Sequence, residues 1–417
     1  MIAEVKAMNK EKSTRRIMLN LRTLGKYTAT PGNGCTRLPF TEDAYDAKEF
    51  IRFLMCDAGL KAHDDGAGNL FGVKKGKNPD LPCIMMGSHY DSVINGGNYD
   101  GIAGVVCALE VARILNEEGI ELEQDFVVAA FNDEEGMRFG TGYFGSKVML
   151  GQITPEECEK FADKDGITVA QAMKEWGLDH TKLPEYKWDL DKIGKFIEVH
   201  IEQGPVLDAQ KIELGLVECI VGIQRYMVTV NGRADHAGTT PMDMRLDAVD
   251  ISTKVVSKLA DMARAKNDGT VATSGFFRAV PCAMNVVSGK VEFSMDIRSQ
   301  NNDNIDDIVN NIKKLLDEEC SKCGASYEIE QKLHITPCYL DQDMLARLEE
   351  AAKAKGYSYK RMLSGAGHDA LAIGQLLPTV MVFVPSKDGR SHCPVEHTEN
   401  EDFTKAVDIV IDMLKTL

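Results

Sequence analysis

Apolar residues in the first 150 positions form short runs that alternate with helical patterns. Cys83–Gly87 and Asp125–Asn132 have the length and apolar content of buried strands. Gly104–Glu117, which lies between them, has a helical pattern. Strands that alternate with helices are typical of a parallel sheet covered by helices. We therefore expect an α/β fold, with a mixed but mostly parallel sheet and helices on both faces.

The order of elements changes between about Leu214 and Lys332. Strands and helices are expected there in the order Tyr226–Asn231 (strand), Arg245–Lys266 (helix), Lys290–Ile297 (strand), Asn304–Cys323 (helix) and Ser326–Lys332 (strand). This order suggests a small α+β sandwich. The first pattern then returns with a helix at Asp343–Lys355, a buried strand at Thr379–Val384 and a helix at Glu401–Leu417. We expect residues 214–332 to form a domain inserted into a larger one made of residues 1–213 and 333–417.

Composition narrows the class of protein. A chain of 417 residues exceeds what one hydrophobic core usually supports, which agrees with two domains. The net charge of -16 argues against nucleic acid, because phosphate binding needs a concentrated basic surface, and a small metabolite fits better. The sequence contains no run of 18 apolar residues, so we expect no membrane span. Met1–Arg22 lacks the apolar core of a signal peptide.

The eleven cysteines are scattered along a chain without an export signal. This distribution predicts free thiols in a reducing compartment, and hence a cytoplasmic protein. Cys320 and Cys323 form a lone pair in a charged, helix-like stretch. Such a pair supplies half of a metal site at most, and its role stays open.

Polar residues with metal-ligand chemistry follow the first predicted strand. In Gly87–Ser92, His89 can offer a neutral imidazole to a metal, and Asp91 can accept the other ring N–H. Asp100 follows in the glycine-containing loop Gly96–Gly101. Glycines allow the backbone to fold this carboxylate back toward the sheet edge, where it could bridge two metals. A phosphate loop is the weaker alternative, because the Gly-x-Gly-x-x-Gly spacing is missing.

Consecutive acidic residues end the second predicted strand, in Asn132–Gly136. Glu134 and Glu135 could simply cap the following helix. The presence of His89 and Asp100 favours another reading, because neighbouring strands of an open α/β sheet end side by side. One glutamate could then bind a metal while the other acts as general base.

Two further segments carry histidines. Ile197–Gly204 alternates like a strand, and its His200 precedes a Gly-Pro break. A strand histidine is more often a satisfied core residue than a metal ligand, and the position of His200 before this break strengthens the case for a ligand. Gly389–Thr398 follows the buried strand near the end of the chain and contains His392 and Glu396. The concentration of histidines in these segments indicates a metal site.

Together, these segments resemble the hydantoinase/carbamoylase branch of the aminoacylase-like dinuclear metallohydrolases. The resemblance extends from Gly32 to His397. The resemblance implies two divalent ions per subunit, held by His89, Asp100, Glu135, His200 and His392, with Asp100 bridging. It implies that Glu134 is the general base, that Asp91 orients His89 and that Glu396 supports His392. Mixed histidine and carboxylate ligands suit Zn²⁺, Mn²⁺ or Co²⁺ about equally.

The resemblance also implies a zinc-exopeptidase-like catalytic domain and an inserted, ferredoxin-like lid and dimerisation domain. His236, in Arg233–Pro241, resembles a histidine that reaches the substrate from a dimer partner. Further positions that resemble substrate contacts are Gln203, Asn285, Arg298, Gly367 and His368. From residues alone, His236 and His368 could be ordinary loop histidines and Arg298 a solvated surface residue.

The function implied is hydrolysis of the N-carbamoyl C–N bond of an N-carbamoyl-L-amino acid, which would yield the amino acid, ammonia and carbon dioxide. The substrate would be small and anionic. An allantoate amidohydrolase would share the same residues, and an N-acyl amino acid or dipeptide hydrolase is the next alternative. A non-catalytic binding protein on this fold would need a broken ligand set, whereas all five ligand positions and Glu134 are intact.

Overall fold

The computed structural model describes the backbone of residues 2–417 and the side chains from Asn9 onward. The chain forms two compact units. Unit 1 runs to Glu218 and resumes at Tyr339–Leu417, and unit 2 is Cys219–Cys338. The inserted unit begins and ends later than expected, because Leu214–Ile220 forms a strand that pairs with Thr379–Val384 in the sheet of unit 1.

Unit 1 is built on a sheet for which the described residues give nine strands, in the order β1-β2-β4-β3-β5-β16-β6-β14, with β15 paired to β6. Their bounds are β1 Lys61–Asp64, β2 Leu70–Lys74, β3 Cys83–His89, β4 Phe126–Phe131, β5 Ile193–Ile201, β6 Leu214–Ile220, β14 Cys338–Tyr339, β15 Tyr359–Ser364 and β16 Thr379–Val384. The central strands β4, β3, β5 and β16 are parallel, whereas β1, β2 and β6 pair antiparallel. The expected mixed α/β sheet with a parallel centre is confirmed.

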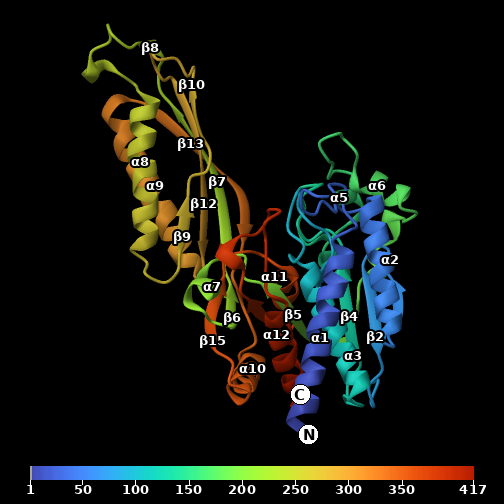
Figure 1. The fold of residues 1–417 in the computed structure, drawn as a ribbon. Coiled ribbons are helices and arrows are strands. Elements are labelled where there is room, and N and C mark those ends of the chain that lie inside the picture. The colour runs from blue at the N-terminus through green and yellow to red at the C-terminus, as the bar shows by residue number, and fades with distance from the viewer. Residues whose placement is uncertain (1) are drawn as a thin grey trace. The chain divides into compact units, whose positions relative to one another are not determined.

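Helices cover both faces of this sheet (Figure 1). One face packs against α1 Ile2–Leu24, α2 Glu42–Asp57, α3 Ile102–Glu117, α10 Gln342–Lys355 and α12 Asn400–Leu414 in one apolar core. The other face carries α4 Phe144–Met149 and α11 Asp369–Gly374. The Ala370 N–H of α11 donates to Glu198, which points away from the first core. The short helices of this unit are α5 Pro155–Cys158, α6 Val169–Glu175 and α7 Val206–Gln210.

Unit 2 is an antiparallel sheet with two helices on one face. The sheet order is β10-β12-β7-β13, with β9 paired to β12, and β8 and β11 form a separate pair. The bounds are β7 Gly222–Asn231, β8 Asp235–His236, α8 Ala248–Arg264, β9 Val271–Thr273, β10 Phe277–Val280, β11 Val286–Val287, β12 Lys290–Ser299, α9 Asn302–Cys323 and β13 Ser326–Ile335. Alternate residues of β7 and β12 pack under α8 and α9, as the period of a strand requires.

The expected elements are present with shifted ends. The helix expected from Arg245 begins at Ala248, because Asp247 caps it by accepting the backbone N–H groups of Val249 and Asp250. The strand expected to end at Ile297 continues to Ser299. Among the helices described, none has the length and apolar character needed to cross a bilayer.

Candidate metal centre

Two histidines converge on one carboxylate oxygen at the edge of the parallel sheet. His89 ends β3 and His200 lies near the end of the neighbouring parallel strand β5. Their Nε2 atoms lie 3.4 Å and 3.1 Å from Oδ1 of Asp100, which is in the loop between β3 and α3. All three side chains are buried. The carboxyl ends of adjacent parallel strands thus place three candidate ligands together, as an open α/β sheet does.

The second oxygen of Asp100 faces another group. Its Oδ2 lies 3.3 Å from Nε2 of His392, accepts a hydrogen bond of 2.7 Å from the Gln203 amide, and lies 3.0 Å from the Ser391 hydroxyl. The His392 side chain is 48% exposed, unlike those of His89 and His200. A carboxylate whose two oxygens face different histidines has the arrangement of a bridging ligand.

The two glutamates that follow β4 point to different partners. Oε2 of Glu134 lies 3.8 Å from Nε2 of His89, and Oε1 of Glu135 lies 3.5 Å from Nε2 of His392. The potential ligand atoms form three overlapping groups, each within 4.8 Å: His89, Asp100 and His200; His89, Glu134 and Glu135; and Asp100, Glu135 and His392. The five predicted ligands and Glu134 therefore meet in one cluster.

Asp91 holds the strand ends in register. Its Oδ1 accepts the Glu134 N–H at 3.0 Å and its Oδ2 accepts the Glu135 N–H at 3.3 Å. Nδ1 of His89 lies 3.2 Å from the Asp91 carbonyl oxygen and 3.4 Å from its Oδ1. Asp91 therefore contacts His89, as expected, and also fixes the backbone that carries both glutamates.

Glu396 contacts the Asp100 loop. Its Oε1 accepts the N–H groups of Tyr99 and Asp100 at 3.0 and 3.1 Å, and its Oε2 lies 2.7 Å from the Ser391 hydroxyl. The resemblance implies that Glu396 supports His392. Its carboxylate accepts hydrogen bonds from the backbone of the Asp100 loop and from Ser391, the residue before His392.

Charge is concentrated in this cluster. Burial raises the pKa of Glu134 well above its ordinary value, and Glu135 adds to the effect while His89 opposes it. Burial and the nearby Asp100 raise the pKa of Glu135 to about 7. Burial lowers the pKa of His89, but Glu134 and the other carboxylates outweigh burial and raise that pKa well above normal. Hydrogen bonding to Asp100 raises the pKa of His392 to about 9.

These groups fit divalent cations. Oε1 of Glu135 is buried without a hydrogen-bond partner among the described residues. Asp91, Asp100 and Glu134 are also buried beside it. Buried carboxylates are costly unless a positive charge compensates them, and histidine nitrogens with carboxylate oxygens are the ligands of zinc, manganese and cobalt.

The backbone is strained where it carries the cluster. Asp133, Gln203 and His392 have φ values of 60°, 60° and 54°, in the left-handed region that most residues avoid. Such conformations cost about 1–3 kcal/mol each and persist where the surrounding structure enforces them, often at functional sites. The strain at Gln203 and His392 accompanies the contact of both side chains with Oδ2 of Asp100.

His368 and Gly367 lie at the start of α11. The His368 ring is 1% exposed, lies 4.4 Å from the His200 ring between centroids, and its Nε2 is 3.0 Å from the Ser364 hydroxyl. Burial lowers its pKa well below normal, so the ring is neutral. His368 thus packs behind His200, which favours the structural alternative. Gly367 approaches Tyr143 so closely that a Cβ would lie 1.8 Å from the phenol oxygen.

The remaining predicted residues belong to unit 2. His236 is exposed at the end of β8, and its Nδ1 accepts the N–H groups of Gly238 and Thr239 at 3.1 and 3.2 Å. The proton of a neutral ring is therefore on Nε2, which is left as a donor. Exposed Asn285 lies beside His236, because its carbonyl accepts the Ala237 N–H.

Arg298 lies at the end of the five-stranded sheet that is remote from the β8 and β11 pair. Lys290, at the start of β12, pairs with Asn231, whereas Arg298 pairs with Ile223 near the start of β7. At a rise of about 3.3 Å per residue, Lys290 and Arg298 are roughly 26 Å apart. The guanidinium of Arg298 pairs with Asp296 at 2.8 Å. Arg298 and Asn285, which both resemble substrate contacts, are therefore far apart within a single chain.

Comparison with known proteins assigns the family. Residues 85–416 match the model of peptidase family M20/M25/M40. The chain belongs to this family. Family M20 is metal-dependent, and its members hydrolyse amide C–N bonds.

Two curated relatives and one solved structure are similar over nearly the whole chain. An N-carbamoyl-L-amino-acid amidohydrolase of Paenarthrobacter aurescens is 38% identical, over 96% of this chain and 97% of the relative. An allantoate amidohydrolase of Bacillus subtilis is 35% identical, over 94% and 95%. A hydantoinase/carbamoylase family amidase from Burkholderia multivorans has a TM-score of 0.88 and 31% identity, with 97% of each chain covered. These matches also confirm the family resemblance seen in the sequence motifs.

Three residues of this M20 chain were not singled out by sequence reasoning. Ser391 lies between Asp100 and Glu396. Ser88 donates to Oε1 of Glu198, a fully buried carboxylate on β5. Serines are so common that their positions in the sequence do not indicate a functional role. The hydrogen bond between Ser88 and Glu198 becomes evident only because the ends of β3 and β5 lie side by side.

Proposed function

We propose that the protein is an N-carbamoyl-L-amino acid amidohydrolase with two divalent ions per subunit. One observation carries the proposal: Asp100 faces His89 and His200 with one oxygen and His392 with the other. A dinuclear centre needs a ligand of that kind. The likeness to N-carbamoyl-L-amino-acid amidohydrolases over almost the full chain supports the choice of substrate class.

The five cluster residues would hold the ions, with His89 and His200 on one side of Asp100 and Glu135 and His392 on the other. When bound, such ions supply a Lewis acid and lower the pKa of water toward neutrality. Zinc, manganese and cobalt fit the donor set equally.

Glu134 would move the proton. Its buried carboxylate is beside His89 and is fixed by the Asp91 bond to its backbone N–H. In this proposal it takes a proton from the attacking water and returns one to the leaving nitrogen. A group whose pKa lies near the working pH can both accept and donate a proton effectively. Burial raises the pKa of Glu134 toward that range.

Unit 2 would bind the substrate. Nε2–H of His236 can donate to the carbonyl oxygen as negative charge develops there, and the Asn285 amide can add a donor. Arg298 can grip the substrate carboxylate with parallel N–H bonds. This anchor explains how an acidic protein would hold an anionic substrate.

The separation within unit 2 favours a homodimer. Arg298 pairs with Ile223 near the start of β7, whereas His236 and Asn285 lie beyond the other end of β12. One small substrate cannot reach both ends of a sheet about 26 Å long. We infer that Arg298 acts in its own subunit, and that His236 and Asn285 come from the partner.

Ammonia release decides the substrate. The metal-loaded enzyme should be assayed with N-carbamoyl-L-amino acids of varied side chain, ureidopropionate, allantoate and an N-acetyl amino acid. Highest kcat/KM on an N-carbamoyl-L-amino acid supports the proposal. Highest kcat/KM on allantoate establishes the second candidate, which the 35% and 33% identical allantoate amidohydrolases favour. Preference for the N-acetyl compound contradicts both.

We place this enzyme in the cytoplasm. The eleven cysteines form no disulfide in the part of the chain that the structure describes, and seven of them are buried. A reducing compartment keeps such thiols intact. Detection of the native protein in an exported fraction would contradict this placement.

A further inference from the structure

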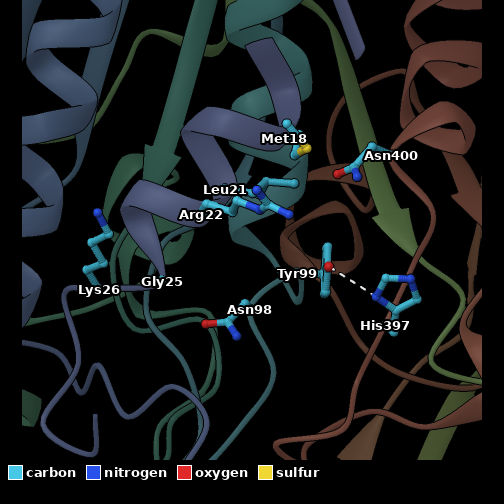
Figure 2. A pocket seen from close by; sticks show the side chains of 9 residues that line it. All are labelled: Met18, Leu21, Arg22, Gly25, Lys26, Asn98, Tyr99, His397 and Asn400. Carbon is cyan, nitrogen blue, oxygen red and sulfur yellow. Dashed lines mark hydrogen bonds between the residues drawn. The ribbon is translucent and has the colours of Figure 1, made fainter. Parts of the chain in front are cut away.

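A cavity of about 290 Å³ lies in unit 1 beside the C-terminal end of α1 (Figure 2). Its walls come from α1, from the loop that precedes Asp100, and from the start of α12. None of the residues around it belongs to the metal cluster. Its volume is at the lower end of the range for small-molecule sites, about 300–1,000 Å³.

The α1 wall is positively charged. Arg22 and Lys26 are both exposed there, and neither forms an ion pair with a carboxylate in the part of the chain that the structure describes. Figure 2 shows the Arg22 side chain extending toward Tyr99.

The other walls supply amides and apolar surface. Asn98 and Asn400 face the cavity from two segments, and Met18 and Leu21 line it from α1. The Tyr99 hydroxyl lies 3.2 Å from Nδ1 of His397. His397 is held in turn, with its Nε2 3.1 Å from a carboxylate oxygen of Glu399. The wall that Tyr99 forms is therefore fixed.

We propose that this cavity binds a small organic anion that has a short apolar body. The anionic group pairs with Arg22 and accepts from the amides of Asn98 and Asn400. The apolar body packs on Met18 and Leu21. Guanidinium and amide donors suit a planar carboxylate, and the cavity has no room for a macromolecule.

Gly25 provides a steric probe of the cavity. A Cβ at this position would lie 2.7 Å from Oδ1 of Asn98, the end of a flexible side chain. Gly25→Ala therefore pushes the Asn98 amide aside without removing charge. Arg15 supplies a matched control for Arg22, because it is also an exposed arginine of α1 but does not line the cavity.

Calorimetry on the metal-loaded enzyme tests the proposal, with isocaproate and its uncharged amide, isocaproamide, as probes. We expect isocaproate to bind the native enzyme at millimolar concentration or below, and isocaproamide at least tenfold more weakly. Arg22→Gln and Gly25→Ala should each weaken isocaproate binding at least tenfold, while Arg15→Gln leaves it unchanged.

Three results overturn the proposal. Absence of isocaproate binding to the native enzyme excludes the site. Equal binding by Arg22→Gln and the native enzyme places the anion elsewhere, for example at the metal centre. If Arg15→Gln weakens isocaproate binding as much as Arg22→Gln does, the affinity depends on the overall charge of α1 and not on the cavity. Far-ultraviolet circular dichroism of each variant shows that it is folded.

Discussion

Glu134 and Glu135 are neighbours in sequence, yet one faces His89 and the other faces His392. Glu134→Gln should retain both metal ions and lose about 10²–10⁴-fold in kcat, because it removes a proton-transfer group. Glu135→Gln should weaken metal binding instead. Metal analysis of the dialysed variants, together with kcat at saturating metal, separates these effects. Equal metal loss in the two variants would refute the division of roles.

Arg298 provides a second test at the residue scale, because Arg225 pairs with the same Asp296 carboxylate and serves as its control. Arg298→Ala should lower kcat/KM by roughly 30- to 4,000-fold, as expected for the loss of a buried charge contact of about 2–5 kcal/mol. Arg225→Ala should have little effect. Carboxamide analogues of the substrate should be poor for the native enzyme and almost insensitive to either change. Similar losses of kcat/KM in both variants would mean that Arg298 stabilises the sheet and does not bind the substrate.

Some of the ligands could be predicted because they are polar and lie at the end of an apolar run or just after it. His89 and Glu135 stand out in this way, since buried strands of a parallel sheet rarely end in such residues without a use for them. The separation of Arg298 and Asn285 follows from the length of β12, whereas the position of His236 beside Asn285 could not be predicted. That position depends on the pairing of β8 with β11, which joins residues far apart in sequence.

At the scale of elements, the turn from β3 into α3 depends on Gly101. Its φ is +62°, and a Cβ there would lie 2.3 Å from the His89 ring. Gly119 has a φ of +63° with no heavy atom within 4 Å of a Cβ. Gly119→Ala should cost about 1–2 kcal/mol through its backbone conformation alone. Gly101→Ala should cost clearly more and also reduce metal content, as urea unfolding and metal analysis can measure. Equal losses in the free energy of unfolding for the two variants, with unchanged metal content in Gly101→Ala, would show that the turn between β3 and α3 can accommodate a side chain.

The elements themselves were largely predictable, and their boundaries were not. Buried strands such as β3 and β16 are continuous apolar runs, so composition marks them. The sequence pattern places the residues of strand β6 in the inserted domain, because only the pairing of β6 with β16 shows that this strand belongs to the sheet of unit 1. Pairing between distant segments leaves no local signal in either one.

At the scale of the whole molecule, metal removal should make stability depend on pH. Burial and Asp100 raise the pKa of Glu135 to about 7, and hydrogen bonding to Asp100 raises that of His392 to about 9. Both pKa values exceed those of the unfolded chain, so the metal-free native state binds more protons, and its stability rises as pH falls. Between pH 8 and pH 6 the buried Glu135 alone should give the chelated protein a gain on the order of 1 kcal/mol in urea unfolding. His392 should add less than its pKa implies, because its side chain is 48% exposed and solvent screens its interactions. Glu135→Gln should lack part of this gain, and an equal gain in both proteins would contradict the assignment.

Subunit mixing tests the arrangement of the dimer, because the proposal assigns each residue to one subunit of a shared site. His236→Ala and Glu134→Gln should each be nearly inactive alone. In a mixed dimer, one of the two sites contains an intact Glu134 from one chain and an intact His236 from the other. Activity should therefore recover to about a quarter of the native level, since half of the dimers in an equal mixture are mixed and half of their sites are complete.

The same assignment of residues to subunits predicts the activity of other mixtures of two variants. Arg298→Ala mixed with His236→Ala should also recover, because these residues reach a given site from different chains. Arg298→Ala mixed with Glu134→Gln should not recover, because both residues serve the site of their own chain. Asn285→Ala mixed with His236→Ala should fail for the same reason, with both supplied by the partner. Subunit exchange must be verified by mass spectrometry of tagged chains. Recovery in the Arg298 and Glu134 pair would place Arg298 in the partner's site, and uniform failure of all four mixtures would mean that each chain completes its site alone.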